Sequence, residues 1–417
     1  MTFNSSTQTK PRFSVLLLSR IFIPFALGYF LSYLYRVVNN VLAGDLAADM
    51  GLDAGQLGLL TGVYLIAFAS SQLPLGILLD RYGPVKVEAV LLLFAAAGAW
   101  VFAQAETVHG LMLGRALIGF GVSACLMAAF KAFVQWFPAD KLPLVNGLQF
   151  TAGGLGILAA AAPVEFALQF TDWRGVFQLL ALATLGVAIL MMTVVPEKPI
   201  AKQPASLQSH VHSILAIFTS PRFWLLSPWA ITTQAVFMAI MSLWSGPWLR
   251  DVAGLERDAV AAVLTWQALG VISGYLVTGL AAERLGRVGV SIPKVVAVGL
   301  SAFMLVQVAL ILEWTAVTGV LWFCFGFFGT SGVLAYAHLS QQFPAELAGR
   351  VNTALNLLVF IMAFLVQWGI GALIEYWSIA GATQYNPAGY QAAFSVLLVL
   401  QTAAMIGYFV QARRQVA

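Results

Sequence analysis

Charged side chains are scarce in this chain. Lysine, arginine, aspartate and glutamate together make up 9% of its 417 residues, whereas hydrophobic residues make up 60%. A soluble domain carries about 25% charged residues. The chain therefore has too few charges for the surface of a soluble protein of this size. Its composition predicts a protein that crosses a lipid bilayer many times.

Residues for covalent, catalytic or metal chemistry are also scarce. The two cysteines, Cys125 and Cys324, lie inside apolar stretches, where we expect them to pack rather than to form a disulfide. The sequence contains no nucleotide-binding loop and no paired catalytic constellation. We therefore expect no enzyme activity, no cofactor, no metal site and no nucleic-acid partner.

Long apolar stretches dominate instead. Twelve of them reach the roughly 20 residues that a helix needs to span a bilayer. They lie at 14–42, 54–79, 87–105, 110–136, 143–170, 174–195, 223–249, 258–281, 292–312, 315–341, 350–377 and 389–411. The polar stretch 196–222 divides them, which predicts an N-terminal six-helix bundle (1–195), a linker and a C-terminal six-helix bundle (223–417). The expected fold class is an all-α membrane protein of two pseudo-symmetric bundles.

Basic residues are distributed unequally between the loops. Only Arg174, Arg250 and Arg257 fall in the loops on the side opposite the linker. Because cytoplasmic loops carry an excess of lysine and arginine, we expect the linker and both termini in the cytoplasm. The membrane would then be an inner or plasma membrane. Three basic residues remain inside the predicted spans: Arg36, Arg115 and Lys131.

Two loop motifs occur once in each half. Residues 137–146 begin Phe-Pro-Ala-Asp and end Val-Asn, and residues 343–352 begin Phe-Pro-Ala-Glu and end Val-Asn. Glycines, an acid and an arginine also recur between 76–86 and 279–287. This repetition predicts duplicated bundles around a central cavity, which rock against each other to give alternating access.

The loop 76–86 reads Gly-Ile-Leu-Leu-Asp-Arg-Tyr-Gly-Pro-Val-Lys. It resembles the signature of the major facilitator superfamily of secondary transporters, and departs from it at Pro84, where a basic residue is common. The resemblance implies that Gly76 allows close helix approach and that Asp80 with Arg81 forms an ion-pair latch. Topology alone would explain Arg81 but neither the glycines nor the acid. The implied gating residues are Gly76, Asp80, Arg81, Gly83, Lys86, Glu283, Arg284 and Gly286.

A second segment, 115–121, reads Arg-Ala-Leu-Ile-Gly-Phe-Gly and resembles another pattern of the same superfamily. The resemblance implies a conformational or proton-transfer role for Arg115. In the alternative interpretation, its side chain only extends to the membrane interface. The glycines look like small-residue contacts between helices. Those of the fourth and fifth spans are Gly119, Gly121, Gly147, Gly153, Gly154 and Gly156.

One arginine lies well inside the first span. An arginine near the bilayer centre costs roughly 2.5–3.5 kcal/mol, so Arg36 is expected to face a wet cavity or a partner. Residues 35–39, Tyr-Arg-Val-Val-Asn, resemble a pattern of the organic anion:cation symporters, in which the arginine engages a substrate carboxylate. Tyr35 stands where many of those proteins have an acid. At helical spacing, one face carries Tyr29, Tyr33, Arg36 and Asn40.

The positions of the acidic residues narrow the class of substrate that we expect. We expect none of the seventeen near a membrane centre: Glu88 lies at the cytoplasmic face, and Glu165 falls toward the outer end of the fifth span. An exporter of cations usually needs a buried acid, so the pattern favours an anion, which arginine's planar fork suits. The alternative for Arg36 is an ion pair with Glu165.

Other candidates complete the site. Lys131 could face the cavity or extend to the cytoplasmic surface. Glu165 and His338 are candidates for proton coupling, since histidine titrates near neutral pH. The remaining substrate-binding candidates are Gln149, Trp244 and Asn356.

Together these observations predict a monomeric secondary active transporter for a small organic anion, preferably a carboxylate, coupled to protons. Three alternatives stay open. They are an exporter of neutral or amphipathic compounds, an organophosphate or phosphate exchanger that uses Arg36 and Lys131, and a receptor of the same fold that does not transport. The stretch 61–79 has no arginine, which disfavours a nitrate porter.

Overall fold

The computed structural model describes residues 17–198, 215–378 and 384–416. Within these ranges the chain forms helices, turns and loops and contains no strand. Most of the linker expected at 196–222 lies outside the described residues, so the division of the chain into two bundles at that point stays a prediction.

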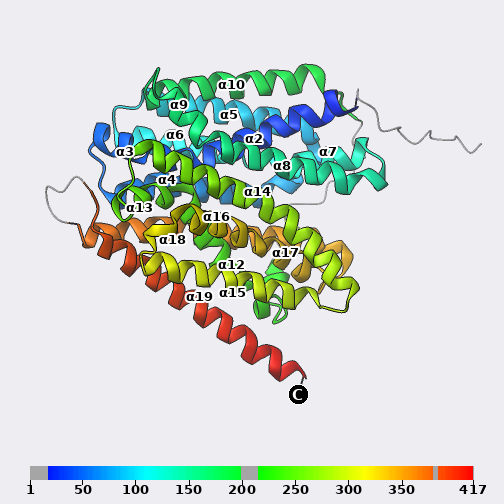
Figure 1. Cartoon of the computed structure of the whole chain (residues 1–417). Coiled ribbons are helices and arrows are strands. Elements are labelled where there is room, and N and C mark those ends of the chain that lie inside the picture. Colours follow the sequence, from blue (N-terminus) through cyan, green and yellow to red (C-terminus); the bar gives the residue numbers. More distant parts are fainter. Residues whose placement is uncertain (1–16, 199–214, 379–383, 417) are drawn as a thin grey trace, which may run out of the picture.

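Among the described residues, the N-terminal half begins with a π-helical turn. The α-helices that follow it, α2 to α10, are labelled in Figure 1. The elements are η1 (Leu18–Phe22), α2 (Ile23–Val37), α3 (Asn39–Met50), α4 (Ala54–Tyr82), α5 (Pro84–Gln104), α6 (Val108–Gly121), α7 (Cys125–Trp136), η2 (Ala139–Lys141), α8 (Leu142–Ala159), α9 (Ala162–Ala167) and α10 (Trp173–Val194).

The C-terminal half has the same character. Its elements are α12 (Phe223–Ala239), η3 (Ile240–Trp244), α13 (Ser245–Asp251), α14 (Arg257–Arg287), α15 (Ile292–Ile311), η4 (Thr315–Val317), α16 (Thr318–Gly329), η5 (Thr330–Gly332), α17 (Val333–Ser340), α18 (Ala345–Tyr376) and α19 (Pro387–Val416).

The helices account for twelve passes through a membrane. Among the described residues, 11 helical stretches are long and apolar enough to cross one. The remaining pass is residues 223–251, which are helical throughout but carry the π-helical turn η3 in the middle. The predicted twelve-helix, all-α membrane fold is therefore confirmed.

Local chemistry explains where several helices start. The Asp53 carboxylate accepts a hydrogen bond from the backbone N–H of Gln56 at 2.6 Å, and the Gln56 side chain accepts one from the Asp53 N–H at 3.2 Å. This reciprocal capping fixes the start of α4. Asp172 caps α10 in a similar way. Gly83 joins α4 to α5 with a φ of 84°, a conformation that glycine adopts at little cost.

The helices of both halves run side by side (Figure 1). Elements α3, α9 and α13 lie at one end of the molecule, which we call the far end. The opposite end, where α7 and α17 finish and where the linker leaves α10, is the linker end. The two halves pack against each other along α4 and α18, along α8 and α14, and where α3 meets η3 and α13.

Small residues allow the helices to pack closely. A Cβ atom at Gly119 of α6 would overlap the carbonyl oxygen of Tyr64 in α4, and one at Gly156 of α8 would overlap that of Phe30 in α2. These positions confirm the expected glycine contacts. A Cβ at Gly147 or at Gly76 would meet no atom within 4 Å, so the close helix contact expected at each of these two glycines is wrong for this conformation.

We expect Gly119→Val to destabilise the protein by about 1–3 kcal/mol, because the new side chain forces α6 away from α4. Gly147→Val is the matched control, since its side chain enters open space. The thermal unfolding midpoint of the purified variants measures the difference. Equal midpoints for the two variants would contradict the packing described above.

Candidate functional site

A cavity of about 260 Å³ lies between the two halves. The N-terminal half contributes residues from α2, α4, α7 and α8, and the C-terminal half contributes residues from α12, η3, α14, α17 and α18. The lining is mostly aromatic and aliphatic. Among the residues that the structure describes, it contains no acidic residue, and Arg36 is its only basic one. A ligand in this cavity would therefore touch both halves and meet one fixed positive charge.

Arg36 lies near the end of α2 with 6% of its surface exposed. None of the ion pairs among the described residues includes it. Its Nε atom is buried without a hydrogen-bond partner. The guanidinium lies over the ring of Tyr33 at 4.4 Å and over those of Phe68 and Phe360 at 5.3 Å each. Ring faces thus stabilise this charge in place of a carboxylate.

Two of these rings connect the halves. Phe68 of α4 and Phe360 of α18 are stacked, with ring centroids 4.2 Å apart and planes 7° from parallel. One helical turn away, the Asn356 amide donates to Gln72 at 3.2 Å, and Tyr336 donates to Asn356 at 3.3 Å. Arg36 therefore lies on the seam between the halves, next to a small polar group that spans the same seam.

The tyrosines around Arg36 are held by their neighbours. Tyr29 and Tyr33 meet edge to face at 5.0 Å. A Cβ at Gly153 of α8 would lie 2.7 Å from the Tyr29 ring and 2.8 Å from the Tyr33 ring, so this glycine makes room for both. Tyr64 of α4 donates a hydrogen bond to the Ser32 carbonyl at 3.1 Å and fixes α2 against α4.

Arg115 is a second buried arginine, and it is fully buried. Its Nη1 donates to the carbonyl oxygen of Tyr35 at 3.0 Å, and its guanidinium lies 5.1 Å from the centre of the Tyr64 ring. The structure thus corrects the alternative in which Arg115 extends to the interface. The arginine instead supports the end of α2, where the chain bends at Val38 before α3 begins.

Four of the eight predicted substrate-binding residues line the cavity. They are Arg36, Tyr29, Tyr33 and Asn356. The structure places the other four, Asn40, Lys131, Gln149 and Trp244, outside the lining.

Each of those four has a structural contact that holds it elsewhere. Asn40 donates to the Met241 carbonyl at 2.9 Å and accepts from the Gly246 N–H, joining α3 to the C-terminal half. Gln149 donates to the Phe25 carbonyl at 3.1 Å, and Trp244 to the Gln367 carbonyl at 3.2 Å. Lys131 of α7 pairs with Asp80, which lies near the end of α4.

The signature loop is placed at the linker end. Asp80 pairs with Lys131 inside the N-terminal half, Lys86 pairs with Glu197 at 2.8 Å, and Arg81 lies over the ring of Tyr82. In the repeated loop Arg284 is exposed. The side-chain surroundings of Glu283 and Gly286 lie outside what the structure describes.

A charged clasp joins the halves at the far end. Arg257 of α14 donates to both carboxylate oxygens of Asp45 in α3, at 2.8 and 2.7 Å, and to Glu165 in α9 at 2.5 Å. The backbone N–H of Ala54 also donates to Glu375 across the seam at 3.1 Å. Glu165, expected as a proton-coupling residue or a partner of Arg36, is thus part of this clasp.

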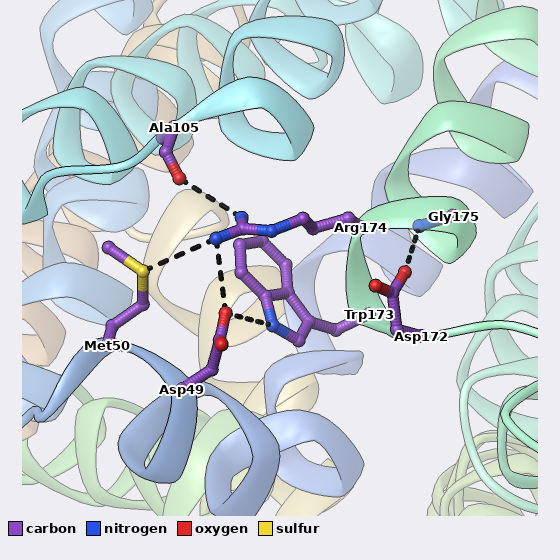
Figure 2. Close-up of polar contacts among 7 residues, drawn as sticks. All are labelled: Asp49, Met50, Ala105, Asp172, Trp173, Arg174 and Gly175. Atoms are coloured by element: carbon purple, nitrogen blue, oxygen red, sulfur yellow. Dashed lines mark hydrogen bonds and ion pairs between the residues drawn. The ribbon is translucent and has the colours of Figure 1, made fainter.

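A second far-end cluster anchors α3 within its own half (Figure 2). Arg174 donates to Asp49 at 3.1 Å and to the Ala105 carbonyl at 3.0 Å. Trp173 donates to the same Asp49 carboxylate at 3.2 Å, and its ring lies 4.1 Å from the Arg174 guanidinium. Because this cluster fixes α3, the Arg257 clasp connects α14 to a rigid part of the N-terminal half.

His338, the other proton-coupling candidate, lies in α17 and contacts Gln342 at 2.8 Å. It does not line the cavity, although Tyr336 on the same helix does. The sequence did not single out Phe68 and Phe360, since a phenylalanine in an apolar span usually only packs against its neighbours. The available signal was an amide one helical turn from each ring, at Gln72 and Asn356.

We expect Arg257→Gln to shift the protein toward states that are open at the far end, because Asp45 and Glu165 lose their partner. Spin labels at the exposed positions Glu106 and Ala316, on loops of opposite halves, report the separation. The distance distribution should broaden toward longer values. Arg174→Gln, which breaks contacts within one half, is the control, and an unchanged distribution in the Arg257 variant would contradict the clasp.

Comparison with known proteins gives one family match. The chain matches the model of the Major Facilitator Superfamily over residues 25–367.

Three named relatives align with parts of the chain. A probable sulfoacetate transporter of Cupriavidus necator is 29% identical over 164 residues, which cover 39% of this chain and 38% of the relative. A nitrate/nitrite transporter of Picosynechococcus is 31% identical over 151 residues, covering 36% and 28%. A hexuronate transporter of Bacillus subtilis is 26% identical over 275 residues, covering 62% and 64%. The alignments thus span less than two thirds of these relatives.

Solved structures match over nearly the whole length. A bacterial homolog of the human lysosomal transporter Spinster superposes with a TM-score of 0.76 at 18% identity, covering 96% of this chain and 98% of the other. The nucleoside transporter NupG superposes with a TM-score of 0.73 at 13% identity, covering 94% and 98%. At these identities the likeness concerns the fold alone.

Proposed function

The chain belongs to the Major Facilitator Superfamily of secondary transporters, and we propose that its substrate is a small organic anion, in the first place a carboxylate. As a member of this family it is a multi-pass membrane transporter rather than an enzyme. The observation that carries the proposal is the buried Arg36, which faces the central cavity without an acidic partner.

The electrostatics of the cavity favour an anion. Burying a cation away from water is costly unless an opposite charge or strong dipoles compensate it. Ring faces around Arg36 supply part of that compensation, and the planar fork of a guanidinium can bind both oxygens of a carboxylate. Relatives named for sulfoacetate, nitrate or nitrite, and hexuronate transport support an anionic substrate.

The rest of the cavity favours an organic anion over an inorganic one. Beyond Arg36 it offers the hydroxyl of Tyr336, the amides of Gln72 and Asn356, and a wide aromatic wall. Nitrate could use the arginine but not these groups at the same time. Organophosphate exchange receives less support, because Lys131 pairs with Asp80 and leaves Arg36 as the one basic residue of the lining.

Substrate binding would act on the seam between the halves. An anion at Arg36 draws the guanidinium away from the stacked Phe68 and Phe360, whose contact joins α4 to α18. Occupancy of the site thereby changes the interaction on which rocking of the halves depends. With basic residues concentrated at the linker end, we place that end in the cytoplasm and the Arg257 clasp on the outer side.

A second candidate is the export of an amphipathic compound. Met127, Met238 and Met241 line the cavity beside the aromatic residues, and methionine-rich surfaces adapt to varied apolar ligands. A multidrug resistance protein of Escherichia coli is 28% identical to this chain over 236 residues. Such an exporter would not depend on the charge of Arg36.

We expect Arg36→Gln to lower the uptake of a transported anion into proteoliposomes by about 10- to 100-fold, since charged hydrogen bonds contribute roughly 1.5–3 kcal/mol. Arg36→Lys should retain part of the activity, because it keeps the charge but loses the fork. The probes are radiolabelled glucuronate and sulfoacetate, with nitrate as the inorganic comparison.

Lys294→Gln, which removes an exposed positive charge, is the control and should transport normally. Uptake by the Arg36→Gln variant at the wild-type rate would contradict the anion site. Resistance of expressing cells to hydrophobic toxins, unaffected by Arg36→Gln, would favour the exporter instead.

A further inference from the structure

The N-terminal half contains a buried carboxyl group that the sequence did not reveal. The sequence places Glu88 at the end of the third span that lies nearest the linker, but it does not predict that the side chain is buried there. Helix α5 begins directly after Gly83, so Glu88 lies in its second turn with no exposed surface. Among the described residues, no N–H or O–H group donates to either of its carboxyl oxygens, and the polar group they contact is the thiol of Cys125.

The Glu88 carboxyl lies behind the parts of α2 and α7 that line the cavity. On the α2 side it approaches Gly28 so closely that a Cβ there would overlap its Oε1 atom, and the same Cβ would lie 3.7 Å from the Sγ of Cys125 in α7. The residues that follow these two in sequence, Tyr29 and Leu126, line the cavity. Glu88 is therefore separated from the cavity by a single layer of α2 and α7.

No cation compensates this carboxyl among the described residues. The helices packed against α5 include α4, α6, α7 and α10, and Glu88 forms an ion pair with none of them. The basic groups on these helices and on α2 contact other residues. Lys131 pairs with Asp80, Arg174 pairs with Asp49, and Arg115 donates to the Tyr35 carbonyl. Arg81 lies over the ring of Tyr82, and Arg36 lies over that of Tyr33. The titratable side chain that faces Glu88 is the thiol of Cys125.

A buried carboxylate without a partner is expensive, so the group is neutral in this conformation. We propose that Glu88 is the proton-binding residue of the transport cycle. It takes a proton from water onto a carboxyl oxygen and returns it to water when movement of α2 and α7 around the cavity hydrates the group. Only the O–H bond forms and breaks, and no electrons are exchanged. Proton binding by Glu88 does not depend on the proposed function, whereas the coupling of this proton to an anion rests on it.

The geometry gives the sign of that coupling. Arg36 lies two helical turns beyond Gly28 on α2, about 12 Å along the helix axis. At an effective dielectric constant near 20, an ionised Glu88 at that distance weakens anion binding at Arg36 roughly tenfold. By linkage, a bound anion favours the protonated form of Glu88 by the same factor. Anion and proton therefore bind together, as a symporter requires.

Infrared spectroscopy tests the proton site without any substrate. At neutral pH the purified protein should show the carbonyl band of a protonated carboxyl group, which shifts on ¹³C labelling of glutamate and is absent from Glu88→Gln. Glu197→Gln, at an exposed position, is the control and should leave the band unchanged. The spectrum of the labelled wild-type protein alone shows whether a protonated glutamate is present, so this test does not depend on the folding of the Glu88→Gln variant. A spectrum without a protonated glutamate band would overturn the proposal.

Transport tests the coupling. In proteoliposomes, the affinity for glucuronate should rise about tenfold as the pH falls in the wild type, and Glu88→Gln should remove this dependence while it still exchanges glucuronate across the membrane. A Glu88→Gln variant that keeps proton-driven accumulation would refute the coupling role. If glucuronate is not transported at all, the proposed function fails for this anion while the infrared result still decides the proton site.

Discussion

The interaction on which this structure depends is the contact of one buried cation with three aromatic rings. Arg36 has no acidic partner among the described residues and lies over Tyr33, Phe68 and Phe360. Phe68 and Phe360 belong to opposite halves, so the same rings that stabilise the charge also hold the halves together. In the proposed function, an anion that binds the guanidinium changes both its contact with the rings and the contact between the halves. Ligand recognition and movement of the protein would then be linked through one side chain.

The rest of the molecule places this side chain and limits its freedom. Glycines such as Gly119 and Gly156 bring the helices of the N-terminal half close together, and Arg115 supports the end of α2 next to Arg36. At the far end, the Arg257 clasp closes the seam against an α3 helix that Asp49 anchors. The cavity therefore lies between two halves that pack against each other along α4 and α18 and are joined at the far end by the Arg257 clasp.

Hydropathy and motif spacing were sufficient to predict the twelve helices and the position of Arg36 at a cavity, because the cost of burying charge in a bilayer acts on every residue of a span. They did not predict the ion pair of Lys131, since the position of a residue along its own helix does not show that Asp80 lies within its reach. The burial of Glu88 was not predicted, because it depends on how α5 packs after the turn at Gly83. The amides of Gln72 and Asn356 lie one helical turn from Phe68 and Phe360, but the stack of these two rings arises only when two distant helices meet.

We propose that Arg36 offers its positive charge, which ring faces compensate only in part, to an anion inside the cavity. Crystals soaked in bromide test this proposal, because the anomalous signal of bromide locates a simple anion without any assumption about the substrate. We expect a peak beside the Arg36 guanidinium, between Tyr33 and the Phe68–Phe360 stack, that disappears in the Arg36→Gln protein. Bromide found only at surface arginines and lysines, with nothing at Arg36, would contradict it.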